Sequence, residues 1–381
     1  MPAERTHELD GLRGIAIALV VSLHSVAEFA VRAFSRLGLP FVGDAVSVTT
    51  YSGLELFFVL SGVLMLRPYL SQARSFDGLR YAKRRVNRIW PPYLAALLFG
   101  GVVIWVAQSH VTWYSRQLLP PFSFPKWLAQ VGVVNLGWTS FNGAWWSLTL
   151  EVAFYLVVPA VALVGGLRRS RRGPAAAIAV VGAITAVSYL RASTPPRISP
   201  MGLVELAFQF LPCFLLGGLL GRYDLSTKAA RILVATGVIL VAIAIAYPSL
   251  NVHAAFAVFW AGVVVLVTRG TSRIRNWLAE PHLVWLGERS YSLFLLHFSV
   301  FYLVDYALSL YLSSRTAVYD LLSRAIGVPL ALLAAMTLFW FVERRLARGL
   351  VTAKAFWPWE VSALDTGFHA RGLPRSGRGG G

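Results

Sequence analysis

The chain has 381 residues, of which 57% are hydrophobic and only 14% are charged, about half the charged share of a soluble protein. This composition excludes a disordered chain and a single soluble globule. The net charge of +18 would suggest nucleic acid in a soluble protein, but the placement of the basic residues points to membrane topology instead. The single cysteine, Cys213, excludes a disulfide framework and a multi-thiolate metal site.

Apolar runs that could cross a bilayer recur along the chain, and a spanning helix needs about 20 such residues. A further stretch, Trp127–Trp138, is too short to span, and we expect it to be re-entrant or interfacial. The sequence therefore predicts an all-α, polytopic membrane protein with about ten transmembrane helices. The ten runs are Gly14–Ala33, Tyr51–Leu70, Pro91–Gln108, Ala144–Gly166, Pro174–Leu190, Leu203–Gly221, Ile232–Tyr247, Val252–Thr268, Tyr291–Tyr311 and Leu321–Phe341.

The basic residues test this count, because cytoplasmic loops carry an excess of Lys and Arg. With the N-terminus in the cytoplasm, 27 of the 35 Lys and Arg residues fall in inner segments and eight in outer ones. We therefore predict that both termini are cytoplasmic. We expect a membrane domain at residues 1–350 and a disordered cytoplasmic tail, rich in Gly and Arg, at residues 351–381.

The first predicted helix carries an arginine and a histidine on one face. Arg13 and His24 are eleven residues apart, about 20° beyond three full turns and a rise of roughly 16 Å. If Arg13 lies at the cytoplasmic surface, where Asp10 can pair with it, His24 lies near the middle of the membrane. His24 then either stabilises a helix contact through a hydrogen bond or acts as a neutral base or nucleophile. The spacing leaves both interpretations open.

Ionisable side chains inside the bilayer are costly and therefore suggest function. Glu151 could orient an imidazole or hold an acceptor hydroxyl, and the alternative is a protonated carboxyl in a packing hydrogen bond. We interpret His297 as structural rather than catalytic. Besides His24, the ionisable side chains in the predicted spans that we single out are Glu28, Glu55, Glu151, His297 and Asp305.

Two arginines precede the third predicted helix. Arg84 and Arg88 would lie one turn apart on one helix face, and because like charges repel there, they favour an anion such as a polyphosphate or a carboxylate between them. The alternative is stop-transfer charge that faces anionic lipid. In the second predicted helix, the small pair Ser61-Gly62 indicates a close helix contact. Walker, G-x-S-x-G, H-E-x-x-H and CxxC motifs are absent, so the sites are expected to work without metal or NTP hydrolysis.

Taken together, these motifs resemble the acyltransferase 3 family of integral membrane acyltransferases. They occur in the family's order over nearly the whole chain, and the predicted helix count agrees with the family core. The resemblance rests on Asp10-Gly11-Leu12-Arg13-Gly14 followed by His24, on Leu56-Phe57-Phe58-Val59-Leu60-Ser61-Gly62, on Arg84-x-x-x-Arg88 leading into Ile89-Trp90-Pro91, on Trp146-Ser147-Leu148 ahead of Glu151, and on Ser290-Tyr291 through His297.

The resemblance implies transfer of an acyl group from cytoplasmic acyl-CoA to a hydroxyl of a glycan, a lipid or a glycosylated metabolite such as a macrolide sugar. Acetyl-CoA is the first candidate donor. By motif, His24 would be the catalytic histidine, with Arg13 as its motif partner and Glu151 as a further catalytic residue. Arg84 and Arg88 would belong to the donor side.

The expected partners are therefore acyl-CoA, the acceptor and the bilayer of the cell membrane, without nucleic acid. No metal and no permanently bound cofactor are expected, and a homo-oligomer stays open. His24 either deprotonates the acceptor hydroxyl or is itself acylated first.

A transporter or flippase for a glycan or a lipid is the alternative function. Ten helices with intramembrane acids would suit a proton-coupled carrier. The sequence shows no internal repeat of the kind that many carriers have. A non-catalytic membrane scaffold is the third interpretation, and it predicts that replacing Arg84 and Arg88 with Gln leaves function unchanged.

Overall fold

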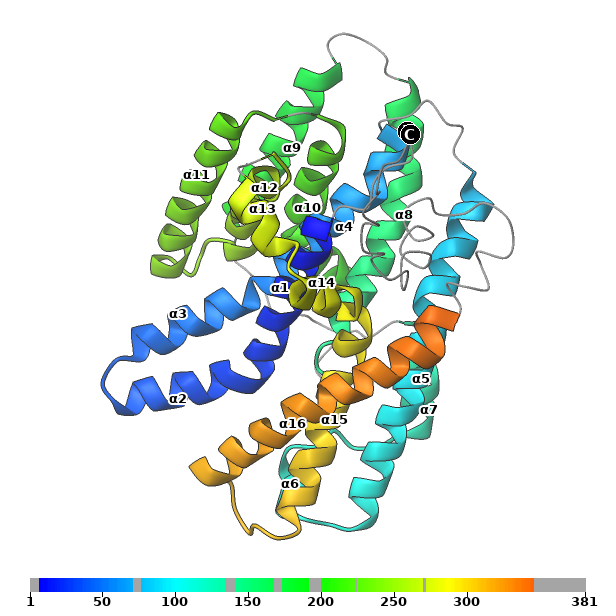
Figure 1. Cartoon of the computed structure of the whole chain (residues 1–381), viewed down its shortest axis with the longest axis vertical. Helices are drawn as coiled ribbons and strands as arrows, with labels where there is room; N and C mark the ends of the chain where they lie inside the picture. Colours follow the sequence, from blue (N-terminus) through cyan, green and yellow to red (C-terminus); the bar gives the residue numbers. More distant parts are fainter. Residues whose placement is uncertain are drawn as a thin grey trace, which may run out of the picture.

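The computed structural model describes residues 7–70, 77–133, 142–167, 173–191, 200–223, 225–269 and 272–345 (Figure 1). Within these ranges the regular secondary structure is helical and contains no strand, which confirms the all-α fold class. The predicted tail at 351–381 lies outside the described residues. The helices are α1 (His7–Ser22), α2 (Glu28–Arg36), α3 (Pro40–Tyr51), α4 (Gly53–Leu70), α5 (Gly78–Ser109), α6 (Trp113–Gln117), α7 (Phe124–Ala129), α8 (Trp146–Leu167), α9 (Gly173–Tyr189), α10 (Pro200–Arg222), α11 (Thr227–Ala246), α12 (Val252–Arg269), α13 (Ser272–Leu278), α14 (Pro281–Glu288), α15 (Ser290–Ser309) and α16 (Ala317–Leu338).

Each predicted span coincides with an apolar helical segment. Within the described residues, eight segments are long and apolar enough to cross a membrane. Two shorter ones, Trp146–Pro159 and Ala175–Tyr189, occupy the fourth and fifth predicted spans. The eight longer segments are His7–Ala27, Pro40–Leu66, Gly78–Ser109, Gly202–Gly221, Thr227–Ala246, Val252–Arg269, Ser290–Ser309 and Ala317–Glu343.

Helices α4 and α10 cross with their backbones in contact. A Cβ atom on Gly62 would collide with the carbonyl oxygen of Phe214, and one on Gly217 would collide with that of Val59. Only glycine permits so close an approach. The predicted close contact at Ser61-Gly62 is therefore confirmed, and it anchors the bundle around which the other helices pack.

The first span is not the single straight helix that its hydropathy suggested. α1 ends at Ser22, a five-residue π-helix follows at Leu23–Ala27, and α2 then turns away from the axis of α1. α2 and α3 form a hairpin that extends to one side of the molecule (Figure 1). His24 lies in the π-helix, a structure that occurs frequently at functional sites.

The helix ends that were predicted to be cytoplasmic lie together. Glu8, at the start of α1, pairs with Arg275 of α13 at 3.2 Å. The guanidinium of Arg289, just before α15, lies 4.7 Å from the centre of the Phe339 ring, which follows α16.

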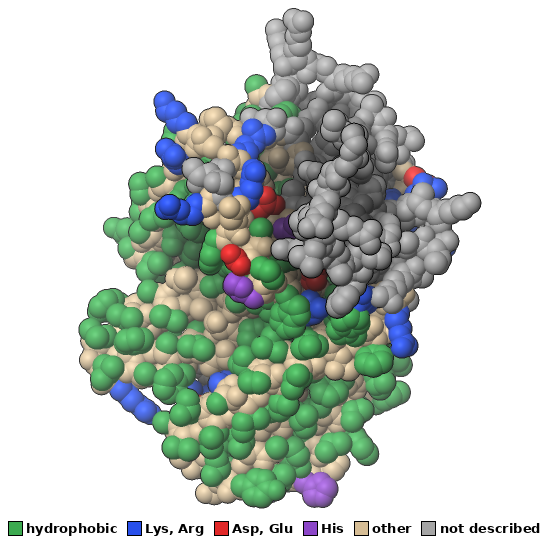
Figure 2. Space-filling model, viewed as in Figure 1, with side chains coloured by type: hydrophobic (Ala, Val, Ile, Leu, Met, Phe, Trp, Pro, Cys, Tyr) green, Lys and Arg blue, Asp and Glu red, His purple; other side chains and the backbone are tan. Residues whose placement is uncertain are grey.

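Hydrophobic side chains cover much of the lower part of the face in Figure 2. Which end of the bundle faces the cytoplasm stays a prediction from charge.

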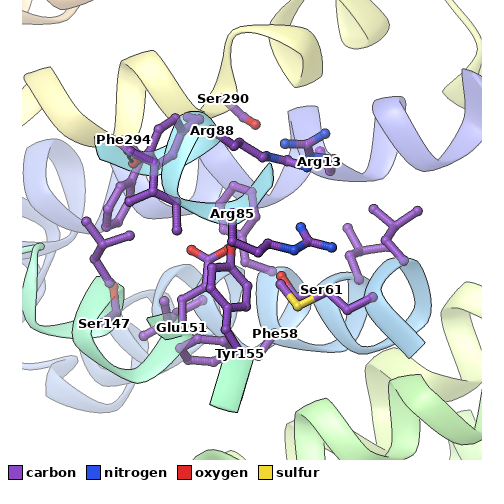
Figure 3. A pocket seen from close by; sticks show the side chains of 18 residues that line it. Arg13, Phe58, Ser61, Arg85, Arg88, Ser147, Glu151, Tyr155, Ser290 and Phe294 are labelled. Carbon is purple, nitrogen blue, oxygen red and sulfur yellow. Dashed lines mark hydrogen bonds between the residues drawn. The ribbon is translucent and has the colours of Figure 1, made fainter. Parts of the chain in front are cut away.

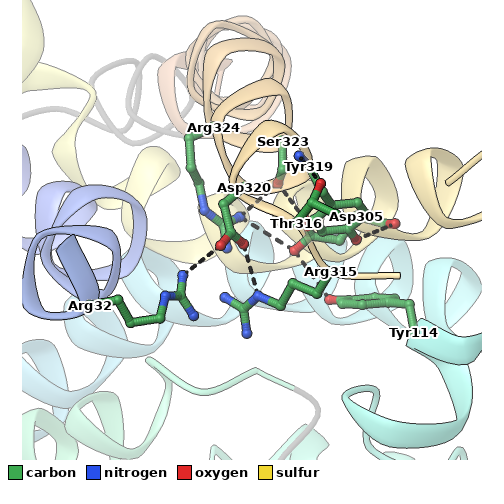
Figure 4. Close-up of polar contacts among 9 residues, drawn as sticks. All are labelled: Arg32, Tyr114, Asp305, Arg315, Thr316, Tyr319, Asp320, Ser323 and Arg324. Atoms are coloured by element: carbon green, nitrogen blue, oxygen red, sulfur yellow. Dashed lines mark hydrogen bonds and ion pairs between the residues drawn. The ribbon is translucent and has the colours of Figure 1, made fainter. Parts of the chain in front are cut away.

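The helix ends that were predicted to be outside also meet, through the polar network in Figure 4. Asp320 of α16 accepts hydrogen bonds from Arg32 of α2 and from Arg315, each at 2.8 Å. The Tyr114 hydroxyl of α6 donates to Asp305 of α15 at 3.3 Å. This network holds the α2–α3 hairpin and α6 against the α15–α16 pair.

The described part of the predicted short stretch, residues 127–133, packs against α5. The Trp127 indole donates to the carbonyl oxygen of Leu97 at 3.0 Å, and the Tyr93 hydroxyl donates to that of Gln130 at 2.7 Å. Leu97 lies in the middle of α5, so the described part of this stretch, which ends at Val133, packs along that helix, and its re-entrant or interfacial place stays a prediction. Irregular backbone is tolerated inside a membrane where protein buries it. Residues 134–141 lie outside the described ranges.

Candidate active site

A cavity of about 90 Å³ lies among α1, α4, α5, α8 and α15 (Figure 3). Arg13 and Arg88 lie on one side of it, Glu151 and Tyr155 lie on the other, and Arg85 lies between them. Side chains of α4 supply most of the apolar wall. Its polar lining consists of Arg13, Ser61, Arg85, Arg88, Ser147, Glu151, Tyr155, Ser290 and Tyr291.

Three guanidinium groups face this small space. Arg13 of α1 approaches Asp10 at 4.0 Å, as its position one turn away predicts. Arg85 of α5 lies over two aromatic rings, 5.3 Å from the centre of Tyr81 and 5.1 Å from that of Tyr155. These rings fix the side chain by cation–π contact, yet its buried Nε atom has no hydrogen-bond partner among the described residues.

Glu151 is the only carboxylate among the lining residues. It accepts a hydrogen bond of 2.6 Å from the Tyr155 hydroxyl, one turn further along α8. The Tyr81 hydroxyl donates to the backbone carbonyl of Tyr155 at 3.2 Å and so joins α5 to α8. The lining thus holds three guanidinium groups and one carboxylate, while Asp10 pairs with Arg13 and Glu343 acts on Arg13 and Arg88 from outside it. The donor groups of the guanidiniums that face the cavity favour an anion.

Of the two arginines predicted to bind an anion together, only Arg88 lines the cavity. Its companion there is Arg85 rather than Arg84. The two are three residues apart, which also places them on one helix face. Arg84 is half-buried and lies outside the lining, so its donor role stays a prediction that this geometry does not support.

His24 lies beyond the cavity rather than in it. Its ring is half-buried, and its Nδ1 atom lies 3.1 Å from Nε2 of His297 in α15. Phe294, which lines the cavity, is one turn before His297, with ring centres 6.2 Å apart. Glu151 lies with the arginines, and within the described residues it makes no contact with His24. The suggestion that it orients this imidazole therefore finds no support.

Two contacts between residues far apart in the sequence could not be predicted from it. His24 and His297 are 273 positions apart, so no local spacing could join them. Glu55 of α4 is fully buried and pairs with His253 of α12 at 2.5 Å, across 198 positions. Among the residues that the structure describes, no group of three His, Cys, Asp or Glu side chains could hold a metal ion.

Comparison of the sequence with known proteins assigns the chain to a family. Residues 6–344 match the acyltransferase domain of the acyltransferase 3 family. The chain is 29% identical over 325 residues to the "Putative membrane-bound transacylase BcsY" of Komagataeibacter xylinus, which covers 81% of this chain and 76% of that protein. It is 27% identical over 319 residues to the acyltransferase MdmB of Streptomyces mycarofaciens, which covers 78% of this chain and 79% of that protein.

No solved structure matches the chain. The family match nevertheless runs from the first described helix to the end of the last one. The cavity and the His24–His297 pair both lie within it. The protein therefore belongs to the acyltransferase 3 family and is a multi-pass membrane acyltransferase.

Proposed function

We propose that the protein transfers an acyl group from acyl-CoA to a hydroxyl of a glycan, a lipid or a glycosylated metabolite, and that it does so in the cell membrane. The observation that carries this proposal is the arginine-lined cavity, which lies one helical turn of α15 from the His24–His297 pair. A site that would bind an anionic donor thus lies near His24, whose side chain can accept a proton.

The charge of the cavity fits the donor. CoA carries several phosphate negative charges, and the planar guanidinium group suits phosphate oxygens. CoA is much larger than about 90 Å³, so its adenosine would stay outside the cavity, beyond the exposed Arg88, with its diphosphate against the guanidinium groups. The narrow pantetheine arm and the acyl group would extend further, along the apolar wall of α4 and past Phe294 toward His24. Acetyl-CoA is the simplest donor of this kind.

Arg13, Arg85 and Glu151 would act on the donor rather than on the acceptor. Arg13 and Arg85 would neutralise its phosphates, and Glu151, held by Tyr155, would fix the position of the guanidinium groups. His24 would then act in one of two ways. It would remove the hydroxyl proton as the new C–O bond forms and the C–S bond breaks, and that proton would pass to the CoA thiolate. Alternatively, its ring nitrogen would accept the acyl group first.

Exchange of label separates these two routes. An acyl-histidine intermediate would let labelled CoA exchange into acyl-CoA in the absence of an acceptor, whereas direct transfer would not. The experiment needs only purified protein in lipid nanodiscs, acetyl-CoA and labelled CoA.

The test of the function itself uses membranes that contain the protein and isotopically labelled acetyl-CoA. Mass spectrometry of the glycans, lipids and secreted metabolites should find an acetyl group on a hydroxyl. His24→Ala should lower the rate by roughly 10²–10⁴-fold, the usual contribution of a general base. His110→Ala, at an exposed position outside the spans, is the matched control and should be unaffected. Wild-type transfer by His24→Ala would refute the proposal, and substrate transport without acyl-CoA would favour a carrier.

A further inference from the structure

The contact between His24 and His297 bears on which nitrogen of His24 can react. The two rings lie on the π-helix Leu23–Ala27 and on α15, with Nδ1 of His24 3.1 Å from Nε2 of His297. Each neutral imidazole carries one proton, so the acceptors around the rings decide where the protons reside. The inference rests on the proposed function of His24.

The proton on His297 is fixed by its own helix. Its Nδ1 atom lies 3.0 Å from the carbonyl oxygen of Leu293 and 2.9 Å from that of Phe294. A carbonyl oxygen only accepts hydrogen bonds, so Nδ1 of His297 must carry a hydrogen. This N–H is shared between the two carbonyls, a common arrangement in helices.

The surroundings of His297 favour its neutral form. The ring is fully buried and lies among aromatic rings, 5.4 Å from Phe298 and 5.9 Å from Phe301 between ring centres. In the described part of the chain, no carboxylate contacts it. A buried cation without a partner is costly, so His297 carries only its Nδ1 proton, and its Nε2 atom is a lone-pair acceptor.

We infer that His297 is a positioning residue that holds His24 in the tautomer with a proton on Nδ1 and a free lone pair on Nε2. Because Nε2 of His297 accepts, Nδ1 of His24 must donate. The Phe298 ring lies across His24, with ring centres 4.6 Å apart, and restricts its rotation. His297, which the sequence suggested to be a structural histidine, therefore determines which nitrogen of His24 reacts.

This tautomer serves both routes. In direct transfer, Nε2 of His24 takes the hydroxyl proton, the hydroxyl oxygen bonds to the thioester carbon, the C–S bond breaks, and the thiolate receives the proton. In the two-step route, Nε2 bonds to the acyl carbon and the thiolate leaves. The first event in each needs the Nε2 lone pair, and a proton on that atom would block it.

Two substitutions of His297 separate positioning from packing. His297→Phe keeps an aromatic ring in the cage but removes the acceptor, and we expect kcat to fall by about 10²–10⁴-fold, with the loss seen when a catalytic histidine is held in the wrong tautomer as the upper end. The KM for acetyl-CoA should change by less than about threefold, because the arginine-lined cavity is untouched. His297→Gln places an amide oxygen near the Nε2 position, and its kcat should be at least about tenfold higher than that of His297→Phe.

Ser299→Ala is the matched control. Ser299 lies on the same helix, is equally buried, and its hydroxyl has no partner among the described residues. It should keep wild-type kcat. A His297→Phe enzyme with wild-type kcat, beside an inactive His24→Ala enzyme, would overturn the positioning role and leave the proposed function intact. An active His24→Ala enzyme would overturn the proposed function itself.

A spectroscopic measurement covers the case in which the His297 variants fail to fold. Solid-state NMR of the wild-type protein with ¹⁵N-labelled histidine, with His24 assigned by loss of its signals in His24→Ala, reports each ring nitrogen. The inference requires a protonated Nδ1 and an unprotonated Nε2 on His24. A protonated Nε2 would contradict it, whatever the activity of the variants.

Discussion

Two polar regions inside this bundle contrast in how their charges are satisfied. In the network of Figure 4, Asp305 receives hydrogen bonds from Tyr114, Ser323 and Arg324, and its backbone carbonyl accepts from Tyr319. In the cavity of Figure 3, the lining holds three guanidinium groups and one carboxylate, and Asp10 pairs with Arg13 from outside the lining. The buried Nε of Arg85 and the hydroxyl of Ser290 have no partner there among the described residues.

The contrast distinguishes a structural site from a ligand site. A buried polar group without a partner costs about 1–3 kcal/mol, so a fold that leaves two of them, Arg85 Nε and the Ser290 hydroxyl, at one cavity holds them ready for a group from outside. A network in which every charge is paired already has its stabilising partners. The following substitutions should therefore affect stability in the first region and donor binding in the second.

Asp305→Ala should have the largest effect, and on stability. The substitution leaves the largely buried guanidinium of Arg324 and two hydroxyl groups without their acceptor. Breaking a buried ion pair lowers the free energy of unfolding by about 3–5 kcal/mol, and thermal unfolding in detergent measures this loss of stability. Arg80→Gln breaks an exposed pair of 3.4 Å and should cost less than about 1 kcal/mol. Equal losses in the two variants would contradict the view that the network is a structural support.

Arg85→Gln should act on the donor instead. Loss of one charge-assisted hydrogen bond to phosphate removes about 1.5–3 kcal/mol, a rise of roughly ten- to a hundredfold in KM for acetyl-CoA. Thermal stability should be unchanged or slightly higher, because like charges are relieved. Lys83→Gln, exposed on the same helix, is the control for overall charge. An unchanged KM in Arg85→Gln would show that the cavity does not bind the donor phosphates.

Tyr155→Phe should have a smaller effect. It removes the 2.6 Å hydrogen bond to Glu151 and costs about 1–2 kcal/mol in donor binding, since the carboxylate no longer has a fixed position. The readout is again KM for acetyl-CoA. Tyr189→Phe loses a similar bond, of 2.9 Å to the Leu240 carbonyl, far from the cavity residues in sequence. If both tyrosine variants raise KM alike, the Glu151 contact has no special role.

Two serines give the finest comparison. Ser290 and Ser323 are both buried, but Ser290 has no hydrogen-bond partner in the described chain, and Ser323 donates to Asp305. Ser290→Ala should leave stability within about 0.5 kcal/mol and raise KM for the donor a few-fold. Ser323→Ala should lower stability by about 1 kcal/mol and leave KM unchanged. A loss of stability in Ser290→Ala together with a raised KM in Ser323→Ala would contradict the assignment of the cavity to donor binding and of the Asp305 network to stability.

Much of the fold could be predicted because hydropathy and loop charge are local properties of the chain. Every predicted span coincides with an apolar helix, and the predicted inner ends lie together, as Glu8 and Arg275 show. The π-helix at Leu23–Ala27 and the separate helix α3 could not be predicted, since hydropathy reports length and not direction. The short helices α13 and α14 lack the apolar length that marks a span.

The candidate site was predictable only in part. Arg13, Arg88 and Glu151 come together in one cavity. Arg85 was overlooked because the spacing of four between Arg84 and Arg88 fits a helix face as well as the spacing of three between Arg85 and Arg88 does. The pairing of His24 with His297 depends on how the π-helix after α1 packs against α15, which no sequence interval encodes.

The most direct test of the account uses a CoA thioester whose short acyl group carries a diazirine. After irradiation of the wild-type protein in nanodiscs, peptide mapping should place the cross-link on residues 20–27 of the first span or on residues 294–301 of α15. Excess CoA should compete with it, and Arg85→Gln should weaken it. Cross-links confined to α9, α11 or the α2–α3 hairpin, or labelling that CoA does not compete, would contradict a donor path from the arginine-lined cavity to His24.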